Sequence, residues 1–299
     1  MDPSLDAHLE LAALEDDEFV RRAYRLVLRR PPDREASERI RTGLADGSLS
    51  RAALLHELVE SDEFARLRAL EEAIDRARRG ETRWLSAPPG DERAIEIPWV
   101  LSRYRGEHRV LDLGSAFAEP AYLASLVSLR PRELVGVDLV AAEIPGMRTE
   151  VADLRLLPFE DQTFELVLCV STLEHVGADN SVYGIEADRD EHGMERALAE
   201  LRRILVRRGR LLVTVPAGAN EDHGWFVQLE PDGWTRLFDE AGFGVADSEL
   251  YELGEDGWGA TERLTPGLRY GERGPGASAI LAAELRPGRF RLPHRLRRS

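Results

Sequence analysis

The stretch Arg109-Val-Leu-Asp-Leu-Gly-Ser115 decides the fold of this 299-residue chain. It is a short apolar run that ends in Asp-Leu-Gly, a pattern typical of a buried parallel strand that turns sharply into a helix. A second apolar run, Val135-Gly-Val-Asp-Leu139, also ends in an acid, about 20 to 30 residues further on. This spacing is expected of one strand–helix–strand unit whose second carboxylate holds a ribose. The two runs together predict a site for a nucleoside-containing cofactor.

The region before this stretch is predicted to be helical. Apolar residues between Phe19 and Val27 recur at helical spacing, and Arg30-Pro-Pro-Asp33 and Gly47-Ser-Leu-Ser50 each end one helix and begin another. Residues 85–90 then contain Ser, two Pro and Gly, a composition typical of a linker. We therefore predict a helical domain over residues 1–84 and a second domain over residues 85–299.

From Arg93 onward, strand-like apolar runs alternate with helical stretches, which predicts a sheet between two layers of helices. Five runs are expected to be parallel strands and the last two an antiparallel pair. In chain order they are Val110–Leu113, Leu134–Val137, Thr149–Val151, Leu166–Val170, Leu211–Val215, Val245–Tyr251 and Ala279–Leu285. The expected fold class is a Rossmann-like, seven-stranded α/β sandwich with a small N-terminal all-α domain.

Composition excludes several classes of function. The formal net charge of −15 repels phosphate backbones, so we expect no nucleic-acid partner. Every Lys or Arg position is an arginine, which excludes a P-loop lysine and any Schiff-base lysine. The chain has no apolar run long enough to span a membrane, and its acidic start is unlike a signal peptide. With the single Cys169 expected in the core, we predict a soluble, cytoplasmic protein without a membrane partner.

Two segments of the N-terminal region resemble a known helical module. The segment from Glu18 to Asp33, together with Leu58-Val-Glu-Ser-Asp-Glu-Phe64, resembles the bacterial modules called domain of unknown function 4214. The resemblance implies a context, because such modules often accompany carbohydrate-processing enzymes. It implies no chemistry of its own.

From Arg93 to Arg286 the chain resembles the class I methyltransferases that depend on S-adenosylmethionine (SAM). Gly114 is followed by Ser-Ala-Phe-Ala, which departs from the dinucleotide pattern G-x-G-x-x-G. The bulky Phe117 leaves little room for a pyrophosphate, so a nicotinamide-dependent oxidoreductase is disfavoured. The segments that carry the resemblance are Leu111–Gly114, Val137–Asp138, Ala152–Val167, Ser171–Val176 and Leu201–Pro216.

This resemblance implies a set of cofactor-binding residues. It places Asp112 near the amino group of the methionine moiety, and Gly114 where the backbone approaches the ligand closely. Asp138 would accept hydrogen bonds from both ribose hydroxyls. Asp153 would accept from the adenine amino group, with the amide of Leu154 facing a ring nitrogen. For any one of these acids alone, helix capping or turn solvation is an equal alternative.

The catalytic group is expected to be a histidine, because a hydroxyl acceptor needs a base near neutral pKa. His175 follows the fourth predicted strand, and His223 follows the fifth in a polar loop; we prefer His223 by a small margin. His192 with Asp188 and Asp190 could hold Mg²⁺, but a solvated acidic loop is favoured, so no metal site is predicted. Part of an aromatic wall for a sugar or ring is expected from Trp225, Trp234, Tyr251 and Trp258.

Taken together, these features predict SAM-dependent O-methylation of a small molecule. A sugar hydroxyl is the first choice, on a nucleotide sugar or a glycosylated metabolite, because the polar insertion after His175 and the N-terminal module resemble parts of carbohydrate and natural-product pathways. The alternatives are a non-catalytic SAM-binding or scaffold module, and methylation of nitrogen or carbon in another metabolite. The helical module is expected either to cap the active site or to form a homodimer.

Overall fold

The computed structural model describes residues 14–76, 79, 86, 87, 89–181, 184 and 189–288. The chain forms two compact units. One comprises residues 1–73 and 119–128, and the other comprises residues 74–118 and 129–299. Part of the predicted linker, residues 85–90, lies outside the described residues, so the boundary at residue 84 stays a prediction.

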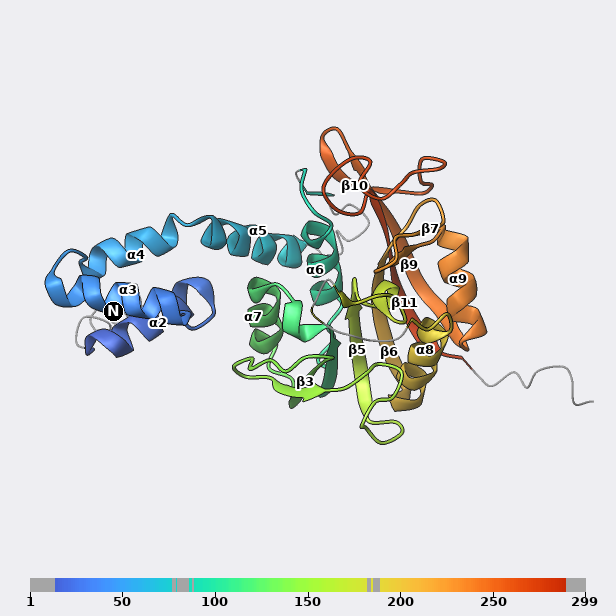
Figure 1. Ribbon diagram of the computed structural model, residues 1–299, viewed down its shortest axis with the longest axis horizontal. Coiled ribbons are helices and arrows are strands. Elements are labelled where there is room, and N and C mark those ends of the chain that lie inside the picture. Colours follow the sequence, from blue (N-terminus) through green and yellow to red (C-terminus); the bar gives the residue numbers. More distant parts are fainter. Residues whose placement is uncertain are drawn as a thin grey trace, which may run out of the picture. The chain divides into compact units, whose positions relative to one another are not determined.

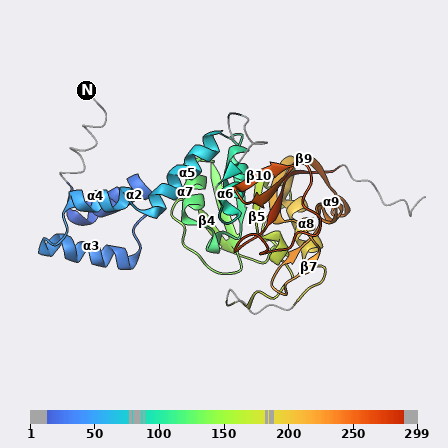
Figure 2. The ribbon, with the colours of Figure 1, turned by 90° about the horizontal axis from the view of Figure 1, so that it is seen from above.

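The first unit is helical, as predicted. Within it, α2 contacts both α3 and α4 (Figures 1 and 2). Asp33 accepts a hydrogen bond from the amide of Ala36, and Ser50 accepts one from the amide of Ala53, so both act as N-caps. Over its described residues, this unit contains the helices α2 (Asp16–Leu28), α3 (Arg34–Asp46), α4 (Arg51–Val59), α5 (Asp62–Arg76, whose end passes into the second unit) and α7 (Pro120–Ser128). None of the helices in the described part of the chain has the length and apolar character needed to cross a bilayer.

The second unit is built on a mixed sheet that has nine strands over the described residues, in the order β1-β10-β9-β11-β6-β5-β2-β3-β4. All seven predicted strands are confirmed, and β1 and β10 extend the antiparallel edge. The strands from β4 to β6 are parallel, whereas β11 and β9 run antiparallel to their neighbours. The bounds are β1 (Ser86–Ala87), β2 (Arg109–Leu113), β3 (Glu133–Asp138), β4 (Arg148–Val151), β5 (Phe164–Val170), β6 (Leu205–Pro216), β9 (Phe243–Gly254), β10 (Gly257–Thr261) and β11 (Ala279–Pro287).

Helices cover both faces of this sheet (Figure 1). On one face lie α8 (Gly193–Ile204) and α9 (Pro231–Glu240), and on the other lies α6 (Arg93–Ser102). Leu111 and Leu113 of β2 belong to the core formed with α8 and α9. Because side chains alternate along a strand, Asp112 faces the side of the sheet on which α6 packs. Three short elements complete the unit: the 3₁₀ turns η3 (Ser115–Phe117) and η4 (Leu173–His175), and the hairpin of β7 (Glu221–Asp222) and β8 (Val227–Gln228).

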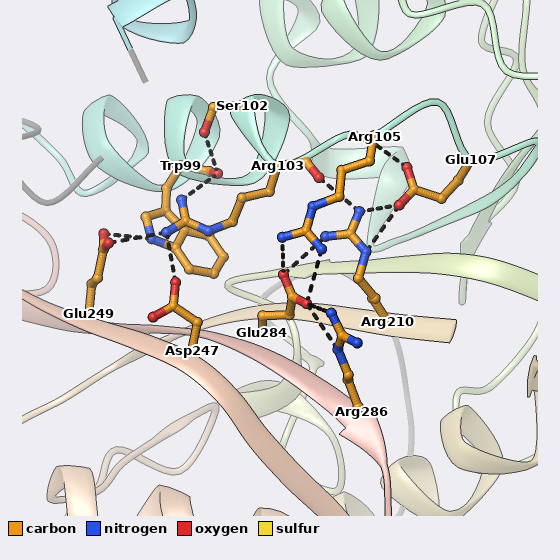
Figure 3. Close-up of polar contacts among 10 residues, drawn as sticks. All are labelled: Trp99, Ser102, Arg103, Arg105, Glu107, Arg210, Asp247, Glu249, Glu284 and Arg286. Carbon is orange, nitrogen blue, oxygen red and sulfur yellow. Dashed lines mark hydrogen bonds and ion pairs between the residues drawn. The ribbon is translucent and has the colours of Figure 1, made fainter. Parts of the chain in front are cut away.

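The carboxyl end of α6 is fixed to β9 by Glu249 (Figure 3). The indole of Trp99 donates to Glu249 Oε2 at 3.0 Å, and Arg103 donates to Glu249 Oε1 at 3.2 Å. The guanidinium of Arg103 also lies 3.7 Å from the centre of the Trp99 ring, within the range of a cation–π contact. Trp99 is fully buried and Arg103 nearly so. These contacts hold α6 against the antiparallel part of the sheet.

A second buried acid, Glu284 of β11, lies beside this contact (Figure 3). It accepts hydrogen bonds from Arg105 at 2.9 Å, from Arg210 at 3.1 Å and from Arg286 at 2.8 Å. Arg210 also pairs with Glu107 and donates to the carbonyl of Arg103. The segment that links α6 to β2 is therefore fixed by charged hydrogen bonds, and α6 enters the site in a defined position.

Candidate active site

The turn after β2 requires a glycine. Gly114 has φ +79°, and its amide donates to the carbonyl of Val137 at 2.8 Å. A Cβ at this position would lie 2.7 Å from Thr172 Oγ1, closer than real Cβ contacts allow. The turn after β2 is thus in direct contact with the segment that follows β5. Because Gly114 has no side chain, a ligand can approach its backbone closely.

Asp138, the last residue of β3, carries a carboxylate held by the backbone of the neighbouring turn. Its Oδ2 accepts from the amide of Ala116 at 2.9 Å, and its Oδ1 accepts from the amide of Leu139 at 2.7 Å. The amide of Val140 also donates to Oδ1, at 3.5 Å, and since a carboxylate has about four acceptor positions, Asp138 can still accept from a ligand. The contact of Asp138 with ribose hydroxyls stays a prediction. Asp112, on the adjacent strand β2, is 1% exposed.

Asp153 is bound by an arginine that the sequence reasoning missed. Arg155 donates to both carboxylate oxygens of Asp153, at 2.6 Å from Nη2 and 3.0 Å from Nε. Burial opposes ionisation, but the hydrogen bonds and the charge of Arg155 prevail and lower the pKa of Asp153. Arg155 also donates to Asp190, which ties the turn to the insertion before α8. The side chain of the next residue, Leu154, is buried in the core, which fixes the position of its backbone.

The two predicted catalytic histidines belong to one aromatic cluster around the β7–β8 hairpin. His223 stacks on Phe226 with ring centres 4.4 Å apart, and His175 lies 5.9 Å from the same ring. Trp225 lies 5.2 Å from His175, and Tyr270 lies 5.5 Å from His223. The residue His223 is exposed, whereas the His175 side chain is 20% exposed.

The hydrogen bond of His175 fixes its tautomer. Its Nδ1 lies 2.9 Å from the carbonyl oxygen of Trp225, which can only accept, so Nδ1 carries the hydrogen and donates. The second nitrogen, Nε2, then holds the lone pair of the neutral ring. Burial lowers the pKa of His175, the charge of Arg93 lowers it further, and the bond to Trp225 opposes both effects. The ring is therefore neutral at pH 7, the form that a general base requires.

A cluster of buried carboxyls near His175 was not predicted. It comprises Glu92, the N-cap residue before α6, Glu96 of α6, Glu174 of η4, and Arg93 of α6 as their counter-charge. Glu96 Oε2 accepts from Arg93 at 2.6 Å, and Glu96 Oε1 accepts from the hydroxyl of Ser171 at 2.7 Å. Glu96 is fully buried. A possible signal was the Glu-Arg-x-x-Glu spacing of residues 92–96, which places these charges on adjacent turns of one helix.

The expected aromatic wall is limited to Trp225. Trp234 and Tyr251 are fully buried, Trp258 is 2% exposed, and each donates a hydrogen bond inside the protein, to Pro216, Glu249 and Gly90 respectively. Their size fills the core, so they cannot line an acceptor site.

The acidic insertion offers no metal site within the described residues. There, no three His, Cys, Asp or Glu side chains are grouped to bind a metal ion, and Asp188 lies outside the described residues. Asp190 is instead paired with Arg155 and Arg196, and His192 is 81% exposed.

Two parts of the chain match known protein families. The family described as methyltransferase domain matches from Leu111 on β2 to Val213 on β6, which includes Gly114, Asp138 and His175. Residues 111–213 are thus similar to methyltransferase domains. SAM, predicted from the same residues, is the cofactor. A second family, the domain of unknown function DUF4214, matches residues 4–68 and confirms the predicted resemblance of the helical module.

Individual relatives match only parts of this chain. An uncharacterized protein of Methanocaldococcus jannaschii is 41% identical over 64 residues, 21% of each protein. EEF1A lysine methyltransferase 4 of Mus musculus is 28% identical over 120 residues, 38% of this chain and 47% of the relative. The chain thus spans less than half the length of either relative. Among solved structures, 1,6-didemethyltoxoflavin-N1-methyltransferase of Burkholderia thailandensis, with bound 1,6-didemethyltoxoflavin and S-adenosylhomocysteine, is 15% identical, with 90% of each chain covered and a TM-score of 0.42.

We expect Asp138→Ala to weaken binding of S-adenosylhomocysteine about a hundredfold, because two hydrogen bonds from hydroxyls to a carboxylate are lost. Calorimetric titration of the full chain measures the change. The affinity of Asp138→Asn should lie between that of the unchanged protein and that of Asp138→Ala. The amide oxygen of asparagine still accepts a hydrogen bond but lacks the negative charge. Unchanged affinity in Asp138→Ala, with an unchanged melting temperature, would show that the ribose is held elsewhere.

Proposed function

We propose that this protein transfers the methyl group of SAM to a hydroxyl of a small molecule, and that this small molecule is a sugar. The observation that carries the proposal is the hydrogen bond from His175 Nδ1 to the carbonyl of Trp225, which leaves the lone pair of the ring on Nε2. Thr172 contacts Gly114, and the amide of His175 donates to the carbonyl of Thr172 at 3.2 Å. A base is thereby held one short turn away from the residues assigned to the methionine end of the cofactor.

The chemistry divides between cofactor and protein. When bound, SAM supplies a methyl group on a positively charged sulfur. His175 Nε2 accepts the proton of the acceptor hydroxyl as the oxygen forms its bond to carbon and the carbon–sulfur bond breaks. Trp225 orients the imidazole through its carbonyl. Alignment of the hydroxyl with the methyl group supplies much of the remaining rate.

His223 is assigned a second role, as part of the wall of the acceptor site. It is exposed and stacked on Phe226, and its Nε2 lies 3.6 Å from Glu221 Oε2. Trp225, which is half-buried beside His175 and Phe226, offers a flat apolar face to a ring-shaped acceptor. The choice of a sugar is supported by this aromatic face and by the DUF4214 module, whose relatives often accompany carbohydrate-processing enzymes.

The proposal is tested by methyl transfer from radiolabelled SAM to a panel of free sugars, nucleotide sugars and phenols. A labelled sugar ether that the Asp138→Ala variant fails to form would support it. Label on a nitrogen or carbon atom of an acceptor would show that this atom, and not a hydroxyl oxygen, accepts the methyl group. Tight binding of S-adenosylhomocysteine without turnover on any member of the panel would favour a non-catalytic SAM-binding module.

A further inference from the structure

Three buried carboxyl groups meet where α6 passes the end of β5. Glu174 is 3% exposed, Glu92 is 9% exposed, and Glu96 has no exposed surface. The ion pairs that the described residues form within this cluster involve one guanidinium, that of Arg93, which lies 2.6 Å from Glu96 and 3.6 Å from Glu92. Glu92 also accepts from the amide of Ala277 at 3.1 Å.

Glu174 differs from the other two acids in its hydrogen bonding. Among the described residues no donor reaches its Oε2, although that atom is buried. Its Oε1 lies 4.0 Å from Nε2 of His175, beyond hydrogen-bond distance. A buried acceptor without a hydrogen-bond partner destabilises the fold, so its presence in a folded site points to a group that arrives with a ligand.

The charges around Glu174 indicate the sign of that group. Burial raises the pKa of Glu174 well above its ordinary value, and the nearby Glu96 raises it further. Burial and Glu96 likewise raise the pKa of Glu92. Arg93 forms its shorter ion pair with Glu96, so the carboxyls of Glu92 and Glu174 lack a full counter-charge. A positive group placed here would restore their ionised form, whereas a negative group would be repelled.

The cluster lies at the reacting end of the site. Glu174 stands between Thr172, which contacts the Gly114 turn, and His175, the proposed base. Ser171, the residue directly after β5, donates to Glu96 and so joins α6 to the same segment. Glu174 and Glu96 therefore lie on or against the segment that carries both Thr172 and the proposed base.

We propose that Glu174, Glu96 and Glu92 form a subsite for a positively charged group at the point of methyl transfer. The group is either the sulfonium of the donor or an ammonium carried by the acceptor, as in an amino sugar. An ammonium would donate the missing hydrogen bond to Glu174 Oε2, whereas a sulfonium would pair with the carboxylate by charge alone. This inference rests on the proposed function, because it places the subsite beside bound SAM.

The donor side is tested by titrating the full chain with S-adenosylhomocysteine, which is neutral at sulfur, and with sinefungin. Sinefungin carries a protonated amine in place of the sulfonium and its methyl group. We expect sinefungin to bind about tenfold or more tightly than S-adenosylhomocysteine, the range of a hydrogen bond to a charged group. In Glu174→Gln the ratio of the two affinities, sinefungin over S-adenosylhomocysteine, should fall to near one. Glu252→Gln, which changes a partly buried, ion-paired glutamate of β9, should leave the ratio unchanged.

The acceptor side is tested in the same protein saturated with S-adenosylhomocysteine, titrated with glucosamine and with glucose. A preference for glucosamine that disappears in Glu174→Gln would assign the positive charge to the acceptor. Equal affinities within both pairs of probes would overturn the cation subsite while leaving cofactor binding intact. Failure of both nucleosides to bind would overturn the proposed function, and this inference with it.

Discussion

Replacing His175 by Asn is expected to lower kcat by roughly 10²- to 10⁴-fold, the usual contribution of a general base. Asparagine places an N–H near the position of Nδ1, so the hydrogen bond to the carbonyl of Trp225 can persist. The nitrogen that accepts the proton is lost. The rate is measured with the sugar acceptor identified in the panel, at saturating SAM.

The same assignment predicts the acid limb of the pH profile. The base acts when neutral, and the pKa of His175 lies below its ordinary value of 6.5, chiefly because the ring is buried. The charged groups that face it are Arg93 of α6, which adds to the lowering, and Glu174 beside it. We therefore expect kcat/KM to fall as the pH drops below 6.5 and to stay level from there to pH 8. In His175→Asn this limb should disappear.

His223→Asn is the matched control, since it removes the other imidazole of the same aromatic cluster. Its expected effect is on KM, because His223 lies in the wall of the acceptor site. A large loss of kcat in His223→Asn together with near-normal turnover in His175→Asn would transfer the role of base to His223. Unchanged affinity for S-adenosylhomocysteine in both variants would confirm that neither change disturbs the cofactor turn.

The parallel strands were predictable because each is a local apolar run ended by a turn residue. Val110–Leu113 became β2 with one residue added at its start, and Asp138 ends β3 where the pattern of apolar residues ends. The edge strands β1 and β10 were missed. Each is short, and β10 reads Gly-Trp-Gly-Ala-Thr, which has little apolar alternation, so only its pairing with β9 makes it a strand.

The site was predictable where a motif is contiguous and unpredictable where distant segments meet. Gly114 and Asp138 follow their strands directly in sequence. The buried carboxyl cluster requires Glu96 of α6 to meet Ser171 after β5, 75 residues apart, and no local pattern reports that contact. The roles of Trp234, Tyr251 and Trp258 were likewise ambiguous. An aromatic residue in the core and one in the wall of a binding site have the same local sequence signal.

The largest expected loss of stability comes from Glu284→Ala. Glu284 is 2% exposed and accepts charged hydrogen bonds from Arg105, Arg210 and Arg286. Its removal leaves the side chain of Arg210, itself 5% exposed, with a reduced counter-charge inside the protein. Breaking a buried ion pair by removing one partner costs about 3 to 5 kcal/mol. We expect the free energy of unfolding of the second unit to fall by about that amount in urea titrations.

Arg105→Ala is the control for this change, because its side chain is 55% exposed and Glu284 retains two other arginines. An exposed partner contributes about 1 kcal/mol or less, so the two variants should differ several-fold in their effect. Because the same network fixes the segment between α6 and β2, Glu284→Ala should also weaken binding of S-adenosylhomocysteine at temperatures at which the variant remains folded. A destabilised variant with unchanged cofactor affinity would show that α6 keeps its position through Trp99, Arg103 and Glu249 alone.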